Sequence, residues 1–196
     1  FEAAKELGLS VNFIVCKGYS LSEVQVLNTN MKNWKSEDYL NAYCDLGYPD
    51  YLKFREFMKK FPDFGFAPSQ IILTNLCTTN RAFFSNEIKT DSNKKGAYTE
   101  RYFQEGRLSI PDYQQSIVNA EKILEVKPYY EGFNRRIFVA AMIGLFKVPH
   151  YSHERLIQRI SSNPTSMQHC SNVSQYKLMI EEIYNFRSRE KVSLRF

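Results

Sequence analysis

The sequence predicts a mainly α-helical protein, in which a short helix–strand segment precedes a multi-helix bundle with a helix-turn-helix-like hairpin. Three observations support this fold class. Apolar residues recur at helical spacing over most of the chain. Helix-starting Ser, Asn and Pro residues and helix-ending Gly residues separate these stretches. Only residues 11–15 alternate between apolar and polar as a strand does.

The composition fits a globular protein with one core, or a small piece followed by a helical domain. Of the 196 residues, 43% are hydrophobic and 24% are charged. No apolar run reaches the roughly 18 residues that a membrane span needs, so no membrane partner is expected. The net charge of +5 permits a nucleic-acid partner without requiring one. The four cysteines are scattered without a CxxC pair, which indicates reduced thiols and a cytoplasmic protein.

The N-terminal residues predict a helix, a glycine turn and a strand. Phe1, Ala4 and Leu7 share a helical face, Gly8 ends that helix, and residues 11–15 form the strand. A short helix is expected over residues 20–30, with Ser20 or Ser22 as its N-cap. Because the chain opens inside a helical pattern, we expect it to be a fragment of a longer protein. The domain boundary is placed between residues 33 and 34.

Two helices are expected next. Ser36 is the predicted N-cap of the first, Glu37 and Asp38 give its first turn the favourable charge, and Gly47 ends it. Pro49 opens the second, which Pro62 stops. The predicted core face of this second helix consists of Leu52, Phe54, Phe57, Met58 and Phe61.

Residues 51–77 have the outline of a helix-turn-helix, because a short glycine-containing turn separates two helical stretches. An ordinary αα-hairpin is the alternative. Ser69, Gln70, Thr74 and Asn75 fall off the apolar face of the second helix. Asn and Gln side chains can read adenine through two hydrogen bonds. These four residues are therefore either DNA-reading residues or plain helix surface.

The C-terminal half predicts a polar loop over residues 85–97 and then further helices, over residues 98–106, 111–127, 132–146, 152–160 and 172–186. In the helix that Pro111 opens, the apolar face is expected to consist of Tyr113, Ile117, Ala120 and Leu124. Residues 132–146 are apolar nearly all round, which predicts the central helix of the bundle. Asn172 is the expected N-cap of the last helix.

The residues give no complete catalytic set. There is no P-loop, GxSxG, HExxH or GxGxxG motif, and the histidines His150, His153 and His169 lack metal-ligand spacing with a third ligand. Basic residues gather in three groups that suit contacts to phosphate. The candidate phosphate-binding residues are Lys59, Lys60, Arg135, Arg136, Arg187 and Arg189. The alternative is that they only solubilise the surface.

The N-terminal residues carry a family likeness. "FEAAKELGLSVNFIV" resembles the segment that follows the "DGQHR" or "GERR" box of ParB-like domains, which have the ParB/sulfiredoxin fold. "QVLNTNMKNWKSEDYLNAY" is similar to the segment that leads into the DNA-binding part of that family. "FQEGRLSIP" and "IEEIYNFRSREKVSLRF" resemble the C-terminal region of ParB-like proteins of phages and mobile elements. The resemblance implies that residues 1–33 are the C-terminal remnant of a ParB/sulfiredoxin-like domain and residues 34–196 a helical DNA-binding domain.

The resemblance also implies a nucleotide pocket bordered by Asn28 and Asn30, with a nucleotide as the cofactor of the intact protein. In chromosome-partitioning members the matching motif reads "ENxxR", whereas here Leu27 replaces the Glu and Met31 replaces the Arg. The implied function is DNA binding through a helix-turn-helix and basic helices. One alternative is a nuclease or nucleotide-dependent enzyme whose catalytic box lies outside this sequence. Another is an interaction module that forms a homodimer through its C-terminal helix.

Overall fold

The computed structural model describes residues 18–20, 23, 34–76 and 102–194, and these residues are mainly helical, with no strand among them. The chain divides into two compact units, Phe1–Lys35 and Ser36–Phe196. The expected strand over residues 11–15, Asn28, Asn30 and the expected loop over residues 85–97 lie outside the described residues. The identity of residues 1–33 as a ParB-like remnant therefore stays a prediction.

In the first unit, Ser20 and Glu23 form a reciprocal cap. The backbone N–H of Ser20 donates to Glu23 Oε2 at 2.7 Å, and the backbone N–H of Glu23 faces Ser20 Oγ at 3.4 Å. This is the capping-box arrangement, in which a serine and a glutamate three residues later satisfy each other's backbone. Ser20 is therefore the N-cap, one of the two positions predicted. The hydrogen bonds from Ser20 lower the pKa of the Glu23 carboxyl.

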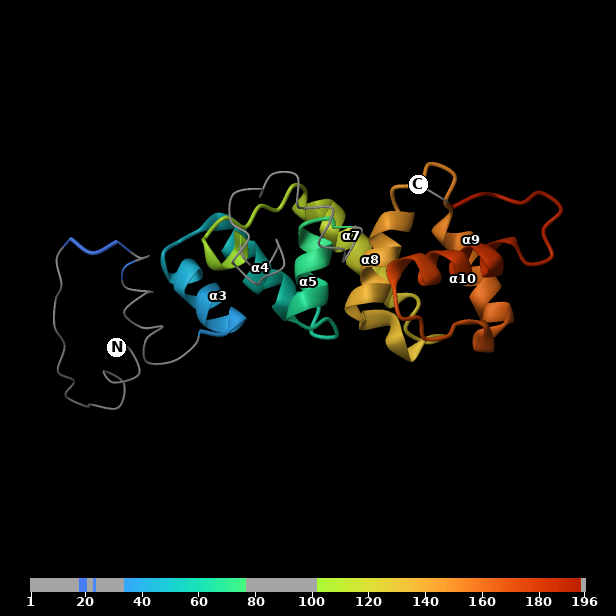
Figure 1. Cartoon of the computed structure of the whole chain (residues 1–196), viewed down its shortest axis with the longest axis horizontal. Helices are drawn as coiled ribbons and strands as arrows, with labels where there is room; N and C mark the ends of the chain where they lie inside the picture. The colour runs from blue at the N-terminus through green and yellow to red at the C-terminus, as the bar shows by residue number, and fades with distance from the viewer. Residues whose placement is uncertain (1–17, 21–22, 24–33, 77–101, 195–196) are drawn as a thin grey trace. The chain divides into compact units, whose positions relative to one another are not determined.

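The second unit begins with two helices joined by a tight turn (Figure 1): α3 (Ser36–Asp45) and α4 (Pro49–Lys60). Ser36 is the first helical residue of α3, so the prediction that it precedes the helix as N-cap is wrong by one position. Gly47 ends the helix as predicted: its φ of 78° is in the left-handed region, which glycine adopts without steric cost. The backbone N–H of Tyr48 then bonds the carbonyl oxygen of Tyr43 at 3.0 Å.

The buried face of α4 differs from the predicted one. Tyr51, Phe54 and Phe57 are its fully enclosed residues, spaced three apart. Phe54, Phe57 and Phe61 were predicted and are confirmed, whereas Leu52 is 39% exposed. The sequence reading favoured Leu52 because leucine has no polar atom to satisfy. Tyr51 takes the buried position because its hydroxyl finds a partner in a later segment.

A turn over residues 61–65 leads to α5 (Phe66–Leu73), which ends four residues before the predicted position 77. Pro68 fits here because the backbone N–H groups of the first helical turn have no partner within the helix. The helix packs against α4, α7 and α8, and all its residues from Pro68 to Leu73 are buried. The helix–turn–helix outline is present, but its second helix lies in the core.

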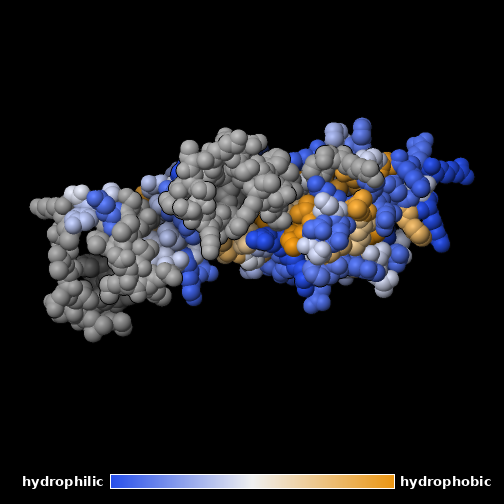
Figure 2. Space-filling model, in the orientation of Figure 1, coloured by the Kyte–Doolittle hydropathy of each residue, from blue (hydrophilic) through white to orange (hydrophobic). Residues whose placement is uncertain are grey.

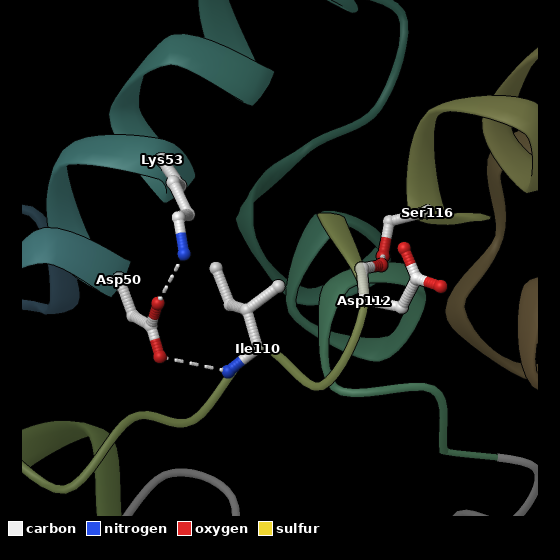
Figure 3. Close-up of polar contacts among 5 residues, drawn as sticks. All are labelled: Asp50, Lys53, Ile110, Asp112 and Ser116. Carbon is white, nitrogen blue, oxygen red and sulfur yellow. Dashed lines mark hydrogen bonds and ion pairs between the residues drawn. The ribbon is translucent and has the colours of Figure 1, made fainter. Parts of the chain in front are cut away.

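The segment over residues 102–110 is fastened onto α3 and α4 by side-chain hydrogen bonds. Tyr43 Oη donates to the carbonyl oxygen of Gln104 at 2.9 Å, and Tyr51 Oη donates to that of Phe103 at 2.6 Å. Asp50 accepts from the backbone N–H of Ile110 at 3.0 Å and pairs with Lys53 Nζ at 2.9 Å (Figure 3). The N-terminal half of this unit therefore depends on polar groups that reach across about fifty to sixty residues.

The helix α7 (Tyr113–Leu124) has a different buried face from the one predicted. Asp112 is its N-cap and accepts from the backbone N–H of Gln115 at 2.9 Å. Its buried residues are Ser116, Asn119, Ala120 and Ile123, so Ile117 and Leu124, which are half-buried, do not line the core centre. Polar residues are tolerated inside because each is bonded: Ser116 Oγ donates to the carbonyl oxygen of Asp112 at 2.7 Å (Figure 3).

The C-terminal elements include one apolar helix that lies in the core, as predicted. They are the 3₁₀-helix η2 (Glu131–Asn134), α8 (Arg136–Leu145), α9 (His153–Ser162), the 3₁₀-helix η3 (Pro164–Ser166) and α10 (Val173–Asn185). Every residue of α8 from Phe138 to Leu145 is buried, and the helix contacts α5, α7, η2 and α10. Asn172 caps α10 as predicted, accepting from the backbone N–H of Gln175 at 2.9 Å.

Candidate nucleic-acid-binding surface

The loop that follows α10 is closed by side-chain clamps. Asn185 bonds both backbone groups of Val192: its amide donates to the carbonyl oxygen and its Oδ1 accepts from the N–H, each at 2.8 Å. Glu181 Oε2 accepts from the backbone N–H of Leu194 at 2.8 Å, and the Leu194 side chain is buried. The loop over residues 186–191 is thus held at its base while its side chains reach outward.

This loop presents basic side chains to solvent. Arg187, Arg189 and Lys191 are all exposed, and none of them pairs with a carboxylate among the described residues. Arg187 has a φ of 53°, an uncommon left-handed conformation for a non-glycine residue. Figure 2 shows hydrophilic side chains gathered at the end of the molecule where this loop lies in Figure 1.

Two arginines of α9 converge on the same loop. Arg155 and Arg159 lie four residues apart, so they share one helical face. Both donate to Ser188 Oγ, at 2.8 Å and 3.1 Å. A neutral hydroxyl balances neither charge, and no carboxylate of the described residues pairs with either guanidinium. Arg155 also lies over the ring of Tyr184, 4.3 Å from its centroid.

Phe186 lines two hollows of this surface. Its side chain is 53% exposed, a large value for a phenylalanine. One hollow, a cavity of about 150 Å³, includes Arg159 and Ser166 in its lining. The second, a groove of about 430 Å³, includes Arg187, Ser188 and Lys191. We refer to α9, the loop over residues 186–191 and these two hollows as the C-terminal basic surface.

The residues predicted to read bases are not presented together. Ser69 and Gln70 are buried, with exposed fractions of 0% and 8%, so the prediction that they lie on the surface of the hairpin is wrong. Thr74 Oγ1 donates to the carbonyl oxygen of Gln70 at 2.6 Å. Asn75 is exposed, but its carbonyl oxygen accepts from Lys147 Nζ at 2.7 Å. Because α5 packs on three helices, it is not free to enter a groove of DNA.

The predicted phosphate-binding residues are exposed, at separate positions in the sequence. Lys59 and Lys60 end α4, and Lys60 Nζ lies 3.7 Å from Glu121 Oε1. Arg135 Nη1 lies 3.1 Å from His169 Nε2, and Arg136 is the first residue of α8. Arg187 and Arg189 belong to the C-terminal basic surface. Sequence reasoning missed Arg155 and Arg159, although their four-residue spacing on a helix was a visible signal.

A buried histidine is the other titratable group with unusual surroundings. His153 is 6% exposed, and its Nδ1 lies 3.0 Å from Tyr151 Oη. Glu125 Oε2 lies 3.3 Å from Nε2 without hydrogen-bond geometry, so Nε2 has no hydrogen-bond partner among the residues that the structure describes. Burial lowers the pKa of His153, although Glu125 opposes the change. The group is enclosed between α9 and earlier segments, which fits a core role.

Within the parts of the chain that the structure describes, no three His, Cys, Asp or Glu side chains gather as a metal site. No helix there is long and apolar enough to cross a membrane. Cys44 and Cys170 are free thiols, and burial raises the pKa of both. No protein-family model, curated protein or solved structure matches the chain.

Proposed function

We propose that this chain binds nucleic acid, with DNA as the primary partner, through phosphate contacts made by the C-terminal basic surface. The observation that carries the proposal is the convergence of Arg155 and Arg159 on the hydroxyl of Ser188, with no carboxylate partner for either among the residues that the structure describes. Arginines placed in this way attract an anion with several oxygen acceptors, and phosphate accepts from two guanidinium groups at once.

The neighbouring residues extend this contact. Arg187, Arg189 and Lys191 follow on the clamped loop, so the surface offers several cations along one face rather than a single charge. Phosphate contacts of this kind position a protein on nucleic acid without reading its sequence. The resemblance of residues 1–40 to ParB-like domains favours DNA over RNA.

The burial of α5 changes the mechanism that the sequence implied. A helix-turn-helix reads bases by inserting its second helix into the major groove, and α5 is enclosed by α4, α7 and α8. In the proposed binding, side chains of α9 and of the loop after α10 therefore contact the phosphate backbone of the DNA. Lys59, Lys60, Arg135 and Arg136 are exposed and extend the set of candidate contacts.

The test is the salt dependence of binding to labelled duplex DNA. The logarithm of the binding constant falls with the logarithm of salt concentration, with a slope of about 0.9 per phosphate contact on duplex DNA. Replacing both Arg155 and Arg159 by Gln is expected to reduce that slope by about 2. The matched control is Lys127→Gln, because Lys127 is already paired with Asp63 at 2.7 Å. An unchanged slope in the double variant would refute the assignment.

A second candidate function is homodimerisation through α10. Leu178 is 50% exposed on this helix, and Phe186 at its C-cap is 53% exposed. Exposed apolar side chains on one element favour a protein contact. Sedimentation of the wild type and of Leu178→Ser over a range of concentrations tests this: a dimer that the substitution weakens would support it, and a monomer at every concentration would exclude it.

A further inference from the structure

Phe186 is the feature of the C-terminal basic surface that phosphate binding does not explain. An exposed phenylalanine ring adds nothing to a contact with a charged backbone, and it costs solvation in the free protein. Two cations lie near its ring: the guanidinium of Arg187 lies 5.2 Å from its centroid, and Arg159 lines the same cavity as Phe186. Aromatic rings surrounded by basic residues are the platforms on which unpaired bases stack.

The polar groups around Phe186 also fit a base better than a phosphate. Glu182 lines both hollows, and its carboxylate has no ion pair among the described residues. A carboxylate repels phosphate, but it accepts hydrogen bonds from the amino groups of bases, as in contacts to cytosine.

The face of a base, on which an aromatic ring stacks, is free only when the base is unstacked, as in a single strand. In a duplex both faces of each base are stacked on their neighbours, so Phe186 has no stacking partner there. The size of the groove, about 430 Å³, admits a single base and its sugar.

Resting on the proposed function, we propose that the C-terminal basic surface prefers single-stranded nucleic acid: an unpaired base stacks on Phe186 while Arg155, Arg159 and Arg187 hold the adjoining phosphates. Single-strand binding by stacking tolerates any sequence, since every base has a π-face. It also accounts for a surface that combines cations, an exposed ring and an unpaired carboxylate.

The experiment compares the whole chain and three variants at Phe186 for binding to a labelled mixed-sequence oligonucleotide and to its duplex. Phe186→Ala is expected to weaken single-strand binding by about 5- to 150-fold, the range given by loss of one stacked base, and to weaken duplex binding by a smaller factor. Phe186→Trp, which retains a ring, is expected to keep the affinity. Phe186→Leu keeps the apolar bulk without the ring, and it is expected to behave like the alanine variant. Thermal melting checks that all variants are folded.

The outcomes separate the two proposals. Loss of single-strand affinity in the Ala and Leu variants, with retention in Trp, supports the stacking site. Equal affinities of all variants for the single strand, with salt-dependent duplex binding intact, overturn the stacking site and leave the proposed function standing. Absence of binding to either form at low salt overturns both.

Discussion

Tyr51 gives the sharpest test of how the N-terminal half of the helical unit is held together. Its side chain is 1% exposed, and its hydroxyl donates to the carbonyl oxygen of Phe103 at 2.6 Å while facing the backbone N–H of Leu108 at 3.4 Å. Burial raises the pKa of Tyr51 above its ordinary value, so the hydroxyl remains a proton donor near neutral pH. Tyr51→Phe removes only this oxygen and keeps the ring in place.

The expected cost follows from the groups left behind. The Phe103 carbonyl loses its short side-chain hydrogen bond in a buried setting and keeps only the longer contact from the Gly106 N–H at 3.4 Å. Leaving a buried carbonyl unsatisfied costs about 1–3 kcal/mol, which is an upper bound here. We expect the free energy of unfolding to fall by about 1–2 kcal/mol, because the N–H of Leu108 makes the longer and weaker contact. For a chain of this size, that corresponds to a fall in Tm of about 2–8 °C.

The assay is urea denaturation with thermal melting as a second measurement. Tyr51→Phe is expected to lower the midpoint without changing the m-value, since the folded surface stays the same. Tyr48→Phe is the matched control: Tyr48 is 40% exposed, is the N-cap residue of the same helix, and its hydroxyl makes no hydrogen bond to the described part of the chain. We expect the control to change stability by less than about 0.5 kcal/mol. If Tyr51→Phe and Tyr48→Phe have the same Tm and the same urea midpoint, the Tyr51 hydroxyl does not hold residues 102–110 against α4.

Three further predictions concern stability. Burial lowers the pKa of His153 in the folded protein below its unfolded value of about 6.5, so the unfolded chain binds the proton more readily. We expect the free energy of unfolding to keep its full value above that pH and to fall below it by up to about 1.4 kcal/mol per pH unit. Urea denaturation across pH should show a smaller slope for His153→Gln. Gly132→Ala places a Cβ against the buried ring of Tyr130, and we expect a loss of about 1–3 kcal/mol by the same denaturation; a neutral substitution would show that the ring moves aside freely. Asp50→Ala removes the acceptor of the Ile110 N–H, with an expected loss of about 1–2 kcal/mol, and faster amide exchange at Ile110 is the readout specific to that bond.

The sequence predicted those parts of the fold that depend on local patterns. The continuous apolar run of α8 predicted the central helix. The caps at Ser20 and Asn172 have a Glu or Gln three residues later, a spacing that the sequence shows directly. These features need only propensity and spacing, and no partner distant in the chain. The mainly helical class followed from the same signals.

The predicted faces failed where tertiary partners decide which polar residues are buried. Ser69 and Gln70 read as surface because they are polar, yet α5 is enclosed on several sides by other helices. Ser116 was left out of the core of α7 for the same reason, although hydrogen bonding to a backbone carbonyl oxygen lets it be buried. The spacing of apolar residues predicts which face of a helix is apolar. It does not predict which polar residues will be buried because a distant segment supplies their hydrogen bonds.

The candidate site could not be predicted from the sequence for a related reason. Arg155 and Arg159 meet Ser188 only because α9 and α10 pack side by side and the loop folds back. Charge counting identified Arg187 and Arg189 as basic residues without showing which other cations share their surface.

The clamp between Asn185 and Val192 has a practical consequence for engineering the chain. Because two hydrogen bonds join these residues, the ends of the loop stay together independently of the covalent path through residues 187–190. Exposed loops whose ends are held close tolerate new chain termini and inserted domains. A flexible insertion between Arg189 and Glu190 should therefore leave the fold intact while it separates the basic side chains on the two sides of the insertion.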